Sequence, residues 1–281
     1  MQHQSDAPSV LPASLVVSLT SYRKRFGTLD LTLRCLLNQS LQPDYTILWI
    51  SHEDRQYVPE AVLELQSHGL RIRYCQDIKS YKKIIPTLQA FPAAFIATAD
   101  DDVRYPAHWL AGLVRAWRNE QAGPSEARPA TAVAWRAHRI VLDPASRRPL
   151  PYRKWQWNCW EIDRPSSLVF PTGVGGVLYP PGIFHPDVAD RQRFEALCPG
   201  ADDVWLYWMC RRNGGRFKAT GQPLTLRHWP GTQLDSLWHK NLVLGNNDRC
   251  IRNMIEHYGL FEDAQAWQIG METAGQAGAA V

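Results

Sequence analysis

The 281-residue sequence lacks several patterns that would place it in a well-marked class. Its six cysteines are scattered, with no CxxC pair and no zinc-type spacing, so we expect reduced thiols. No apolar run has the length of a membrane span, and the first residues lack the basic and apolar regions of a secretory signal. These absences predict a cytoplasmic protein, either soluble or peripheral at the inner face of the plasma membrane.

Phosphate-binding fingerprints are missing as well. Neither GxGxxG nor GxxxxGK[ST] occurs, so neither a dinucleotide fingerprint nor a P-loop is present. The net charge of +4 is too mild for a nucleic-acid-binding face, although it is compatible with anionic ligands. What the sequence has in excess is tryptophan, with twelve residues. Tryptophan can line sugar sites, while packing is the ordinary explanation for any one of them.

The first 120 residues alternate short apolar runs with helical patterns. The runs that suit buried strands are 15–19, 45–51, 70–74 and 93–99. Three helical patterns are present, one after the first run, one after Pro59 and one after Pro106. Strands separated by helices of this length predict an α/β fold with a mostly parallel, Rossmann-like sheet that has helices on both faces. Its ligand crevice should lie at the carboxyl ends of the strands.

Three consecutive carboxylates, Asp100, Asp101 and Asp102, follow the fourth predicted strand. Because adjacent carboxylates repel one another, an ordered site that holds them together favours a cation, and oxygen ligands suit Mg²⁺ or Mn²⁺. The alternative is that one aspartate caps the next helix and the others are solvated. Basic residues follow the first and third strands, namely Arg23, Lys24, Arg25, Lys79, Lys82 and Lys83. Acids and cations at one edge suit a diphosphate, although the lysine run taken alone favours a solvated loop.

The second half opens with a predicted hairpin that pairs 131–142 with a return strand over 152–157. Trp155 and Trp157 lie there among arginines and lysines, either as a surface for an acceptor with phosphate or lipid or as a packed face. Gly175 and Gly176 belong to a glycine-rich segment that permits close backbone approach. Further on, Asp202 and Asp203 open a helical pattern, where capping competes with a chemical role.

Taken in order, these motifs resemble the nucleotide-sugar glycosyltransferases of the GT-A fold, close to bacterial family 2 type enzymes of capsule and O-antigen synthesis. The resemblance runs from Leu15 to Met254. It is carried by the Val-Val-Ser-Leu-Thr-Ser-Tyr first strand, by Leu-Leu-Asn-Gln-Ser-Leu-Gln-Pro-Asp in the first helix, by Asp100 to Asp102 as the DxD motif, by the glycine-rich segment 173–182 and by Ala201-Asp202-Asp203.

The resemblance implies a division of labour along the chain. We expect a flexible leader at 1–13, a nucleotide-sugar-binding half at 14–120, an acceptor-binding and catalytic-base half at 121–260, a small β/α extension on the acceptor side, and a tail at 261–281. Asp102, Asp100 and His228 are expected to bind Mn²⁺ or Mg²⁺. The residues expected to contact the donor nucleotide are Thr20, Tyr22, Arg25, Glu53, Asp54, Lys79, Lys83, Asp100 and Asp101.

On the acceptor side, the resemblance implies that Asp203 is the general base of an inverting transfer, with Asp202 as its rival. Gly175, Gly176, Trp155 and Trp157 would face the acceptor or the donor sugar. The expected substrates are a nucleotide-diphosphate sugar, UDP-sugar by family frequency, and a glycan or lipid-linked acceptor in cell-surface polysaccharide synthesis. Arg227-His228-Trp229 is at best a fragment of the QxxRW motif of processive synthases, which predicts single transfer.

Two other functions compete with this prediction. A nucleotidyltransferase that makes nucleotide sugars would need a glycine-rich basic loop near the N-terminus, and 18–25 has no glycine. A noncatalytic glycan-binding protein would explain the tryptophans but would leave the carboxylates without a task.

Overall fold

The computed structural model describes residues 11–122, 129–232 and 245–260 of the chain, and its central element is a seven-stranded sheet. The strand order is β3-β2-β1-β4-β8-β5-β9. The strands are β1 (Leu15–Thr20), β2 (Tyr45–Ser51), β3 (Leu70–Cys75), β4 (Phe95–Ala99), β5 (Thr131–Ala134), β8 (Val177–Tyr179) and β9 (Arg216–Ala219). Every neighbouring pair is parallel except those that include β8, so the predicted mostly parallel sheet is confirmed. Strands from both halves of the sequence belong to this one sheet.

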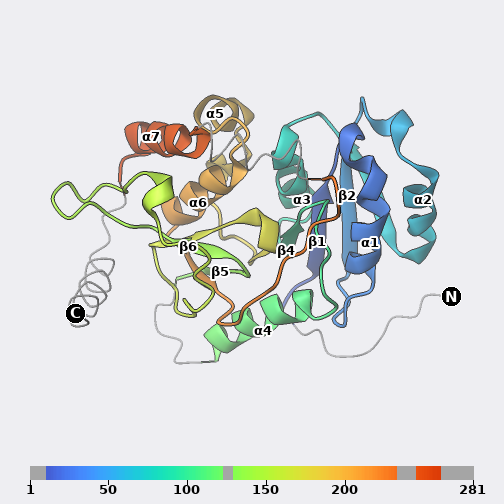
Figure 1. Ribbon diagram of the computed structural model, residues 1–281, viewed down its shortest axis with the longest axis horizontal. Helices are drawn as coiled ribbons and strands as arrows, with labels where there is room; N and C mark the ends of the chain where they lie inside the picture. Colours follow the sequence, from blue (N-terminus) through green and yellow to red (C-terminus); the bar gives the residue numbers. More distant parts are fainter. Residues whose placement is uncertain (1–10, 123–128, 233–244, 261–281) are drawn as a thin grey trace.

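Helices cover both faces of the sheet (Figure 1). They are α1 (Leu29–Leu37), α2 (Glu60–Leu63), α3 (Ile85–Ala90), α4 (Trp109–Gln121), α5 (Arg191–Leu197), α6 (Asp202–Arg212) and α7 (Asn246–Tyr258). Apolar residues of α1, α2 and α4 form one core cluster, while α3, α5, α6 and α7 contribute to the other. Neighbours along β4 divide between the two, because Phe95 packs in the first cluster and Ile96 in the second. Burial on both faces explains why these strands are continuous apolar runs.

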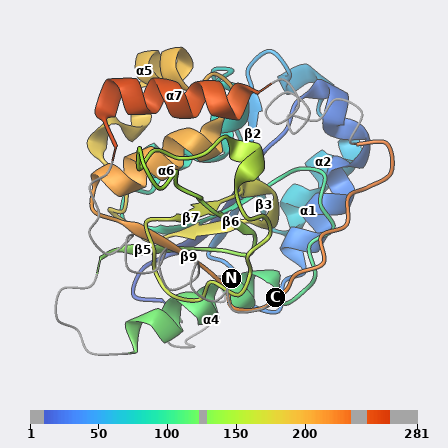
Figure 2. The same cartoon turned by 60° about the vertical axis from the view of Figure 1, so that its left-hand side comes forward.

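A second, two-stranded sheet pairs β6 (Ala137–Arg139) with β7 (Val169–Pro171) beside α6 (Figure 2). The prediction of a return strand over 152–157 is wrong, since Tyr152–Lys154 form a 3-10 turn. Only isolated bridges join Leu142 to Pro149 and Arg139 to Gln156 in this part of the described chain. Pro149 and Pro151 have no N–H groups to donate, which prevents a regular ladder here.

Element boundaries differ from the predictions in two further places. The helix expected between Pro59 and Gly69 is a short α-helix, Glu60–Leu63, followed by a 3-10 turn over Glu64–His68. The basic run Lys79–Lys83 is also a 3-10 turn, and it buries Lys82 and Lys83 rather than leaving them solvated. Within the residues described, no helix is long and apolar enough to cross a membrane. The six cysteines are free thiols, as predicted.

Candidate active site

The three carboxylates after β4 have different partners. Asp101 is buried, accepts a 2.5 Å hydrogen bond from the Ser21 hydroxyl, and burial raises its pKa to about 7. Asp102 lies 2.7 Å from an Arg25 nitrogen and 3.5 Å from Nδ1 of His228. Burial acts to raise the pKa of Asp102, but His228 and Arg25 together lower it below the ordinary value. We call Arg25, Asp101, Asp102 and His228 the Asp102 group.

A segment from the far end of the sequence places His228 in this group. Val103 and His228 form an antiparallel bridge, and the Arg104 N–H donates to the Arg227 carbonyl at 2.8 Å. The Trp229 N–H donates to the Asp102 carbonyl at 3.1 Å, and its indole N–H donates to Thr32 in α1 at 2.8 Å. Sequence reasoning singled out His228 by resemblance, and this pairing is the physical reason it lies beside Asp102.

The Asp102 group fits a divalent metal through two protein ligands, Asp102 and His228. Among the described residues, no three His, Cys, Asp or Glu side chains gather in a metal-binding arrangement, and Asp100 is not grouped with the other two predicted ligands. Two protein ligands suffice for Mg²⁺-like ions when substrate phosphates and water complete the shell. Arg25 also donates a hydrogen bond to the Thr232 carbonyl at 2.5 Å, so its guanidinium links Asp102 to Thr232.

Lys83 is the centre of a second charged cluster. Its ammonium lies 3.0 Å from an Asp100 oxygen and 3.0 Å from an Asp202 oxygen, and the residue is 6% exposed. Burial acts to lower the pKa of Lys83, but the charges of Asp100, Asp202 and Asp203 raise it well above the usual value. Lys83 is therefore a charged ammonium, and it joins the motif after β4 to the start of α6. We call Lys83, Asp100, Asp202 and Asp203 the Lys83 group.

Asp202 and Asp203 begin α6, yet neither side chain caps that helix. Asp202 is 5% exposed and contacts Lys83, whereas Asp203 is partly open to solvent. Both oxygens of Asp203 accept the Gly173 N–H, at 3.1 and 3.0 Å. Burial, together with the charge of Asp202, raises the pKa of Asp203 to about 7. Of the two acids, Asp203 is thus the more accessible and is a stronger base than an ordinary aspartate.

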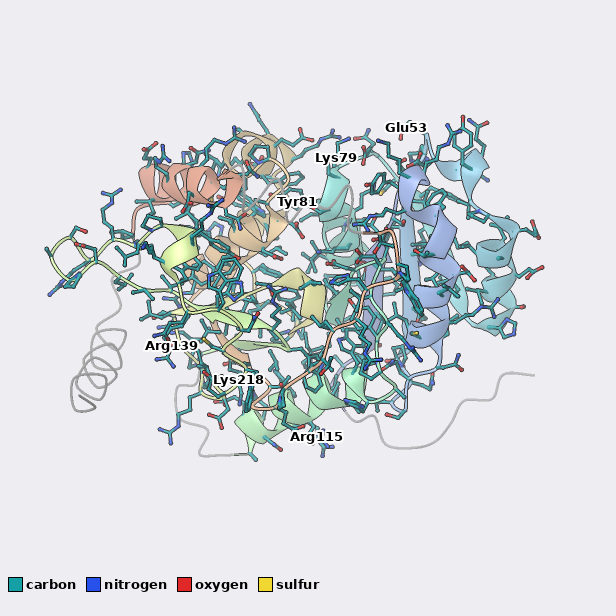
Figure 3. The ribbon with its side chains drawn as sticks, in the orientation of Figure 1. Glu53, Lys79, Tyr81, Arg115, Arg139 and Lys218 are labelled. Carbon is teal, nitrogen blue, oxygen red and sulfur yellow. The ribbon has the colours of Figure 1, made fainter. Side chains whose placement is uncertain are left out.

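The other predicted donor residues lie around the ends of β1, β2 and β3. Thr20 donates to the Trp49 carbonyl at 2.8 Å, and Tyr22 is 37% exposed. Glu53 is exposed after β2, while Asp54 accepts the Arg23 N–H at 3.3 Å. Lys79 points outward and pairs with Asp77. Figure 3 shows Glu53 and Lys79 at the same edge of the molecule, opposite Arg115.

Several residues predicted to face the acceptor are instead packed against neighbouring side chains. A methyl group on Gly175 would lie 2.9 Å from Cβ of Arg136, and one on Gly176, whose φ is +88°, would meet the Trp109 ring at 2.5 Å. Trp155 is 4% exposed and packs in an aromatic cluster with Tyr152 and Phe170. Trp157 is half-buried and stacks on His138, with ring centroids 4.8 Å apart. The exposed side chains of segment 143–160 include four basic ones, namely Arg147, Arg148, Arg153 and Lys154, together with Trp160.

Sequence reasoning missed Arg136, and it placed Ser21 and Gly173 in site segments without assigning their contacts. Ser21 bonds Asp101, the Gly173 backbone holds Asp203, and Arg136 lies next to the same glycine-rich turn. Arg136 follows the carboxyl end of β5 by two residues, and β5 runs in the direction of β4. The rule that ligands bind beyond strand carboxyl ends would have found it, had β5 been recognised as part of the parallel sheet.

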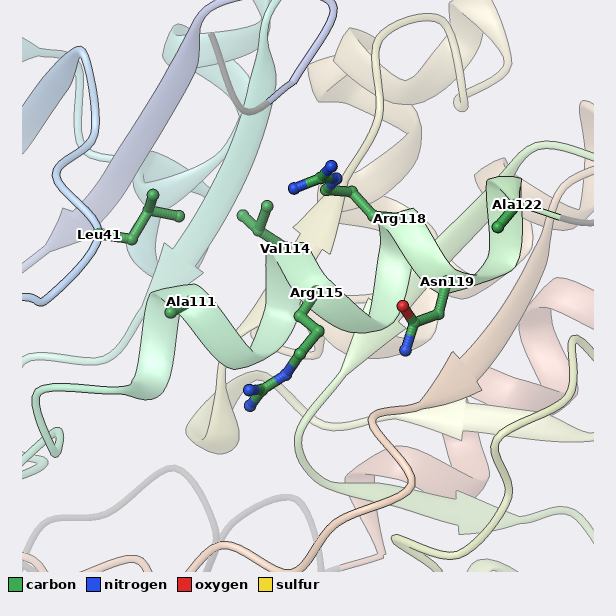
Figure 4. A pocket seen from close by; sticks show the side chains of 7 residues that line it. All are labelled: Leu41, Ala111, Val114, Arg115, Arg118, Asn119 and Ala122. Atoms are coloured by element: carbon green, nitrogen blue, oxygen red, sulfur yellow. The ribbon is translucent and has the colours of Figure 1, made fainter. Parts of the chain in front are cut away.

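A shallow pocket lies elsewhere, along α4 (Figure 4). Its floor includes Leu41 and Val114, with Arg115, Arg118 and Asn119 at its side. No carboxylate is among the described residues that line it, so it shares nothing with the Asp102 and Lys83 groups.

Comparisons with known proteins bear on the fold. No family model and no curated protein matches the chain. Among solved structures, the mannosyltransferase PcManGT from Pyrobaculum calidifontis in complex with GDP-Man and Mn²⁺ superposes with a TM-score of 0.54 at 13% identity, over 98% of this chain and 72% of that one. TarS from S. aureus superposes with a TM-score of 0.50 at 10% identity, over 92% of this chain and 69% of that one. At such identities the likeness establishes architecture, and the architecture is the GT-A fold expected from the sequence.

Proposed function

We propose that this protein is a glycosyltransferase that moves a sugar from a nucleoside-diphosphate donor to a hydroxyl group of an acceptor, with inversion at the anomeric carbon. The observation that carries the proposal is the position of Lys83, whose one ammonium contacts both Asp100 after β4 and Asp202 at the start of α6. Through it, the predicted donor motif and the predicted base motif become two sides of a single site.

The chain offers donor contacts beyond the carboxyl ends of β1, β2 and β4. Arg25 can bind a diphosphate oxygen in place of Asp102, because a guanidinium group binds phosphate as readily as carboxylate. Asp102 and His228 would hold Mn²⁺ or Mg²⁺, which stabilises the charge on the leaving nucleoside diphosphate. Thr20, Tyr22, Glu53 and Asp54 would contact the base and ribose. The donor complexes of PcManGT support this class of ligand.

On the other side of the site, Asp203 accepts the proton of the attacking hydroxyl. The Gly173 N–H fixes the orientation of both Asp203 oxygens, so the base is positioned before the acceptor arrives. Lys83 offsets the charges of Asp100 and Asp202, which leaves Asp203 as the accessible acid of the pair. This arrangement favours Asp203 over Asp202 as the base.

Direct binding of nucleoside diphosphates tests the proposal. Wild type should show higher thermal stability with one nucleoside diphosphate plus Mn²⁺ than with either alone, because ligands that bind the native state raise its stability. Asp102→Asn should abolish the metal-dependent part of that shift. Asp30→Asn, which changes a surface carboxylate paired with Arg34 in α1, is the matched control and should keep it.

Three outcomes would contradict the proposal. If no nucleoside diphosphate shifts the folded wild type, the donor site does not exist. If Asp102→Asn keeps the metal-dependent shift, the metal lies elsewhere. Turnover of a nucleoside triphosphate and a sugar phosphate, with release of diphosphate, would instead show a nucleotidyltransferase.

A further inference from the structure

Arg136 lies beside the turn that holds the proposed base. Its carbonyl accepts the Thr172 N–H at 3.0 Å, and a methyl group on Gly175 would come within 3.0 Å of its backbone nitrogen. Gly173, in the same turn, donates its N–H to Asp203. The backbone of Arg136 is therefore fixed on the Asp203 side of the site.

The guanidinium of Arg136 is half-buried and is held on one side only. Its Nε donates to Oδ1 of Asn158 at 2.8 Å. Within 11–122, 129–232 and 245–260, no carboxylate lies within 4.0 Å of it, and its terminal nitrogens have no hydrogen-bond partner. Burial lowers the pKa of Arg136, and its interactions with Tyr152, Asp203 and Asp100 compensate only in part. A guanidinium that is held at Nε, with no carboxylate beside it and both terminal nitrogens open, can bind an anion through the two of them.

A short chain of contacts orients this guanidinium. Asn158 has φ = +58°, a left-handed conformation that is uncommon outside glycine, and its N–H donates to Nδ1 of His138 at 3.2 Å. Burial lowers the pKa of His138 to about 3, so the ring is neutral and can accept at Nδ1. Trp157 stacks on that ring at 4.8 Å. These contacts hold Nε, and the two terminal nitrogens stay available as a fork for a carboxylate or a phosphate.

The neighbours of Arg136 separate it from the donor side. Arg25 pairs with Asp102 and bonds the Thr232 carbonyl, so the Asp102 group already has its own guanidinium for a diphosphate. Arg136 instead shares the 172–175 turn with Asp203. An anion bound by Arg136 would lie next to the base, where the acceptor belongs.

We propose that Arg136 binds a carboxylate or phosphate group of the acceptor, so that the acceptor carries a negative charge close to the hydroxyl group that Asp203 deprotonates. This inference rests on the proposed function for the identity of the acceptor. The binding of an anion at Arg136 does not depend on it. Arg136 thereby favours an anionic acceptor, since a neutral sugar would form no charge-assisted hydrogen bonds with its guanidinium.

Calorimetric titration with small hydroxyl-bearing anions tests the inference. The probes are glycerol 3-phosphate and glycerate, with glycerol as the neutral control. Wild type should bind at least one of the anions and not glycerol. Arg136→Gln should weaken that binding about 10- to 100-fold, the range expected for losing hydrogen bonds between a guanidinium and an anion. Arg136→Lys, which keeps the charge but not the fork, should fall between the two.

Two controls separate this inference from its alternatives. Arg148→Gln removes an exposed positive charge from the segment between β6 and β7 and should leave anion affinity within about twofold of wild type. The affinity of Arg136→Gln for the nucleoside diphosphate should also match wild type. If Arg136→Gln fails to fold, Asn158→Ala keeps the cation, removes its orienting hydrogen bond and should weaken anion binding about 3- to 10-fold.

Several results would overturn the inference. Wild type that binds neither anion, or variants that bind as wild type does, would show that Arg136 is no anion site. An equal loss of nucleoside diphosphate affinity in Arg136→Gln would assign it to the donor instead. Failure of the proposed function has a different signature, because then no nucleoside diphosphate binds, whereas the anion titration still reports on Arg136.

Discussion

The two charged groups of the site are neutralised in different ways. In the Asp102 group, Arg25 comes from the turn after β1, makes one ion pair and also bonds the Thr232 carbonyl. In the Lys83 group, one ammonium whose side chain is 8% exposed contacts two carboxylates at once. An incoming metal and phosphate can replace what Arg25 does for Asp102. A substrate brings no cation that could replace Lys83. We therefore call the Asp102 group adjustable, because its cation can be exchanged, and the Lys83 group fixed.

The largest effect should come from removing the proposed base, Asp203, from the Lys83 group. Asp203→Asn should lower kcat about 10²- to 10⁴-fold, since an amide cannot accept the proton. Asp202→Asn should cost less turnover, because Asp202 contacts Lys83 and is buried. Initial rates at saturating donor measure both. Equal losses would show that the two acids act as a unit, and a larger loss for Asp202→Asn would reverse their roles.

A change to the fixed cation should reveal itself in stability. Lys83→Met leaves Asp100, Asp202 and Asp203 without their shared cation, and we expect the free energy of unfolding to fall by about 3 to 5 kcal/mol. Lys79→Met is the matched control, because Lys79 belongs to the same 3-10 turn but has an exposed side chain. Its effect should stay below about 1 kcal/mol. Urea unfolding measures both, and similar values would mean that Lys83 is not the centre of the group.

The pH dependence separates two acids with similar pKa values. Asp203 and Asp101 both have a pKa of about 7, raised first of all by burial. Asp203 must be ionised to accept a proton, so kcat should rise about tenfold per pH unit below 7 and level off above it. Because its pKa is above the unfolded value, protonated Asp203 favours the folded state, and that stability is lost as pH rises through about 7.

Stability measurements supply the control for this pH dependence. The difference in unfolding free energy between Asp203→Asn and wild type should grow in favour of the variant from pH 4 to pH 8. Ionisation of Asp101 should appear in the KM of the donor rather than in kcat. A kcat that is flat between pH 5 and pH 8 would rule out Asp203 as a base with this pKa.

The smallest effect is expected in the adjustable group. Arg25→Gln removes the 2.7 Å ion pair with Asp102, but His228 remains beside the carboxylate. We expect the free energy of unfolding to fall by about 1 to 2 kcal/mol, and affinity for the nucleoside diphosphate with Mn²⁺ to fall about tenfold. Urea unfolding and calorimetric titration measure the two quantities. A stability loss as large as that of Lys83→Met would remove the distinction between the groups.

Much of the fold was predictable because its signals are local. The strand Tyr45–Ser51 and the helix Leu29–Leu37 follow from an apolar run and from helical spacing. The α/β class followed from their alternation. The antiparallel insertion of β8 between β4 and β5 had no such signal, because pairing between distant strands leaves no periodicity in either one.

The site was predictable where strand ends supplied it. Asp100, Asp101 and Asp102 follow β4 directly, and Asp202 and Asp203 open α6, as expected. The partners of these acids were less visible. Lys83 resembles a solvated residue in sequence, and only the fold shows that carboxylates from two elements surround it. Trp155 shows the reverse, since a residue suited to a sugar site is 4% exposed and packed.

The pairing of 102–104 with 227–229 has a consequence for the order of folding. Arg25 and the Thr232 carbonyl are 207 residues apart in sequence, and Trp229 and Thr32 are 197 apart. Contacts of such separation close large loops and form late, and the ribosome releases residue 232 long after β1 to β4 are available. Strands β1 to β4 can therefore pair before the Asp102 group is complete. A nascent chain of this protein can hold its first four strands together while Asp102 still lacks His228.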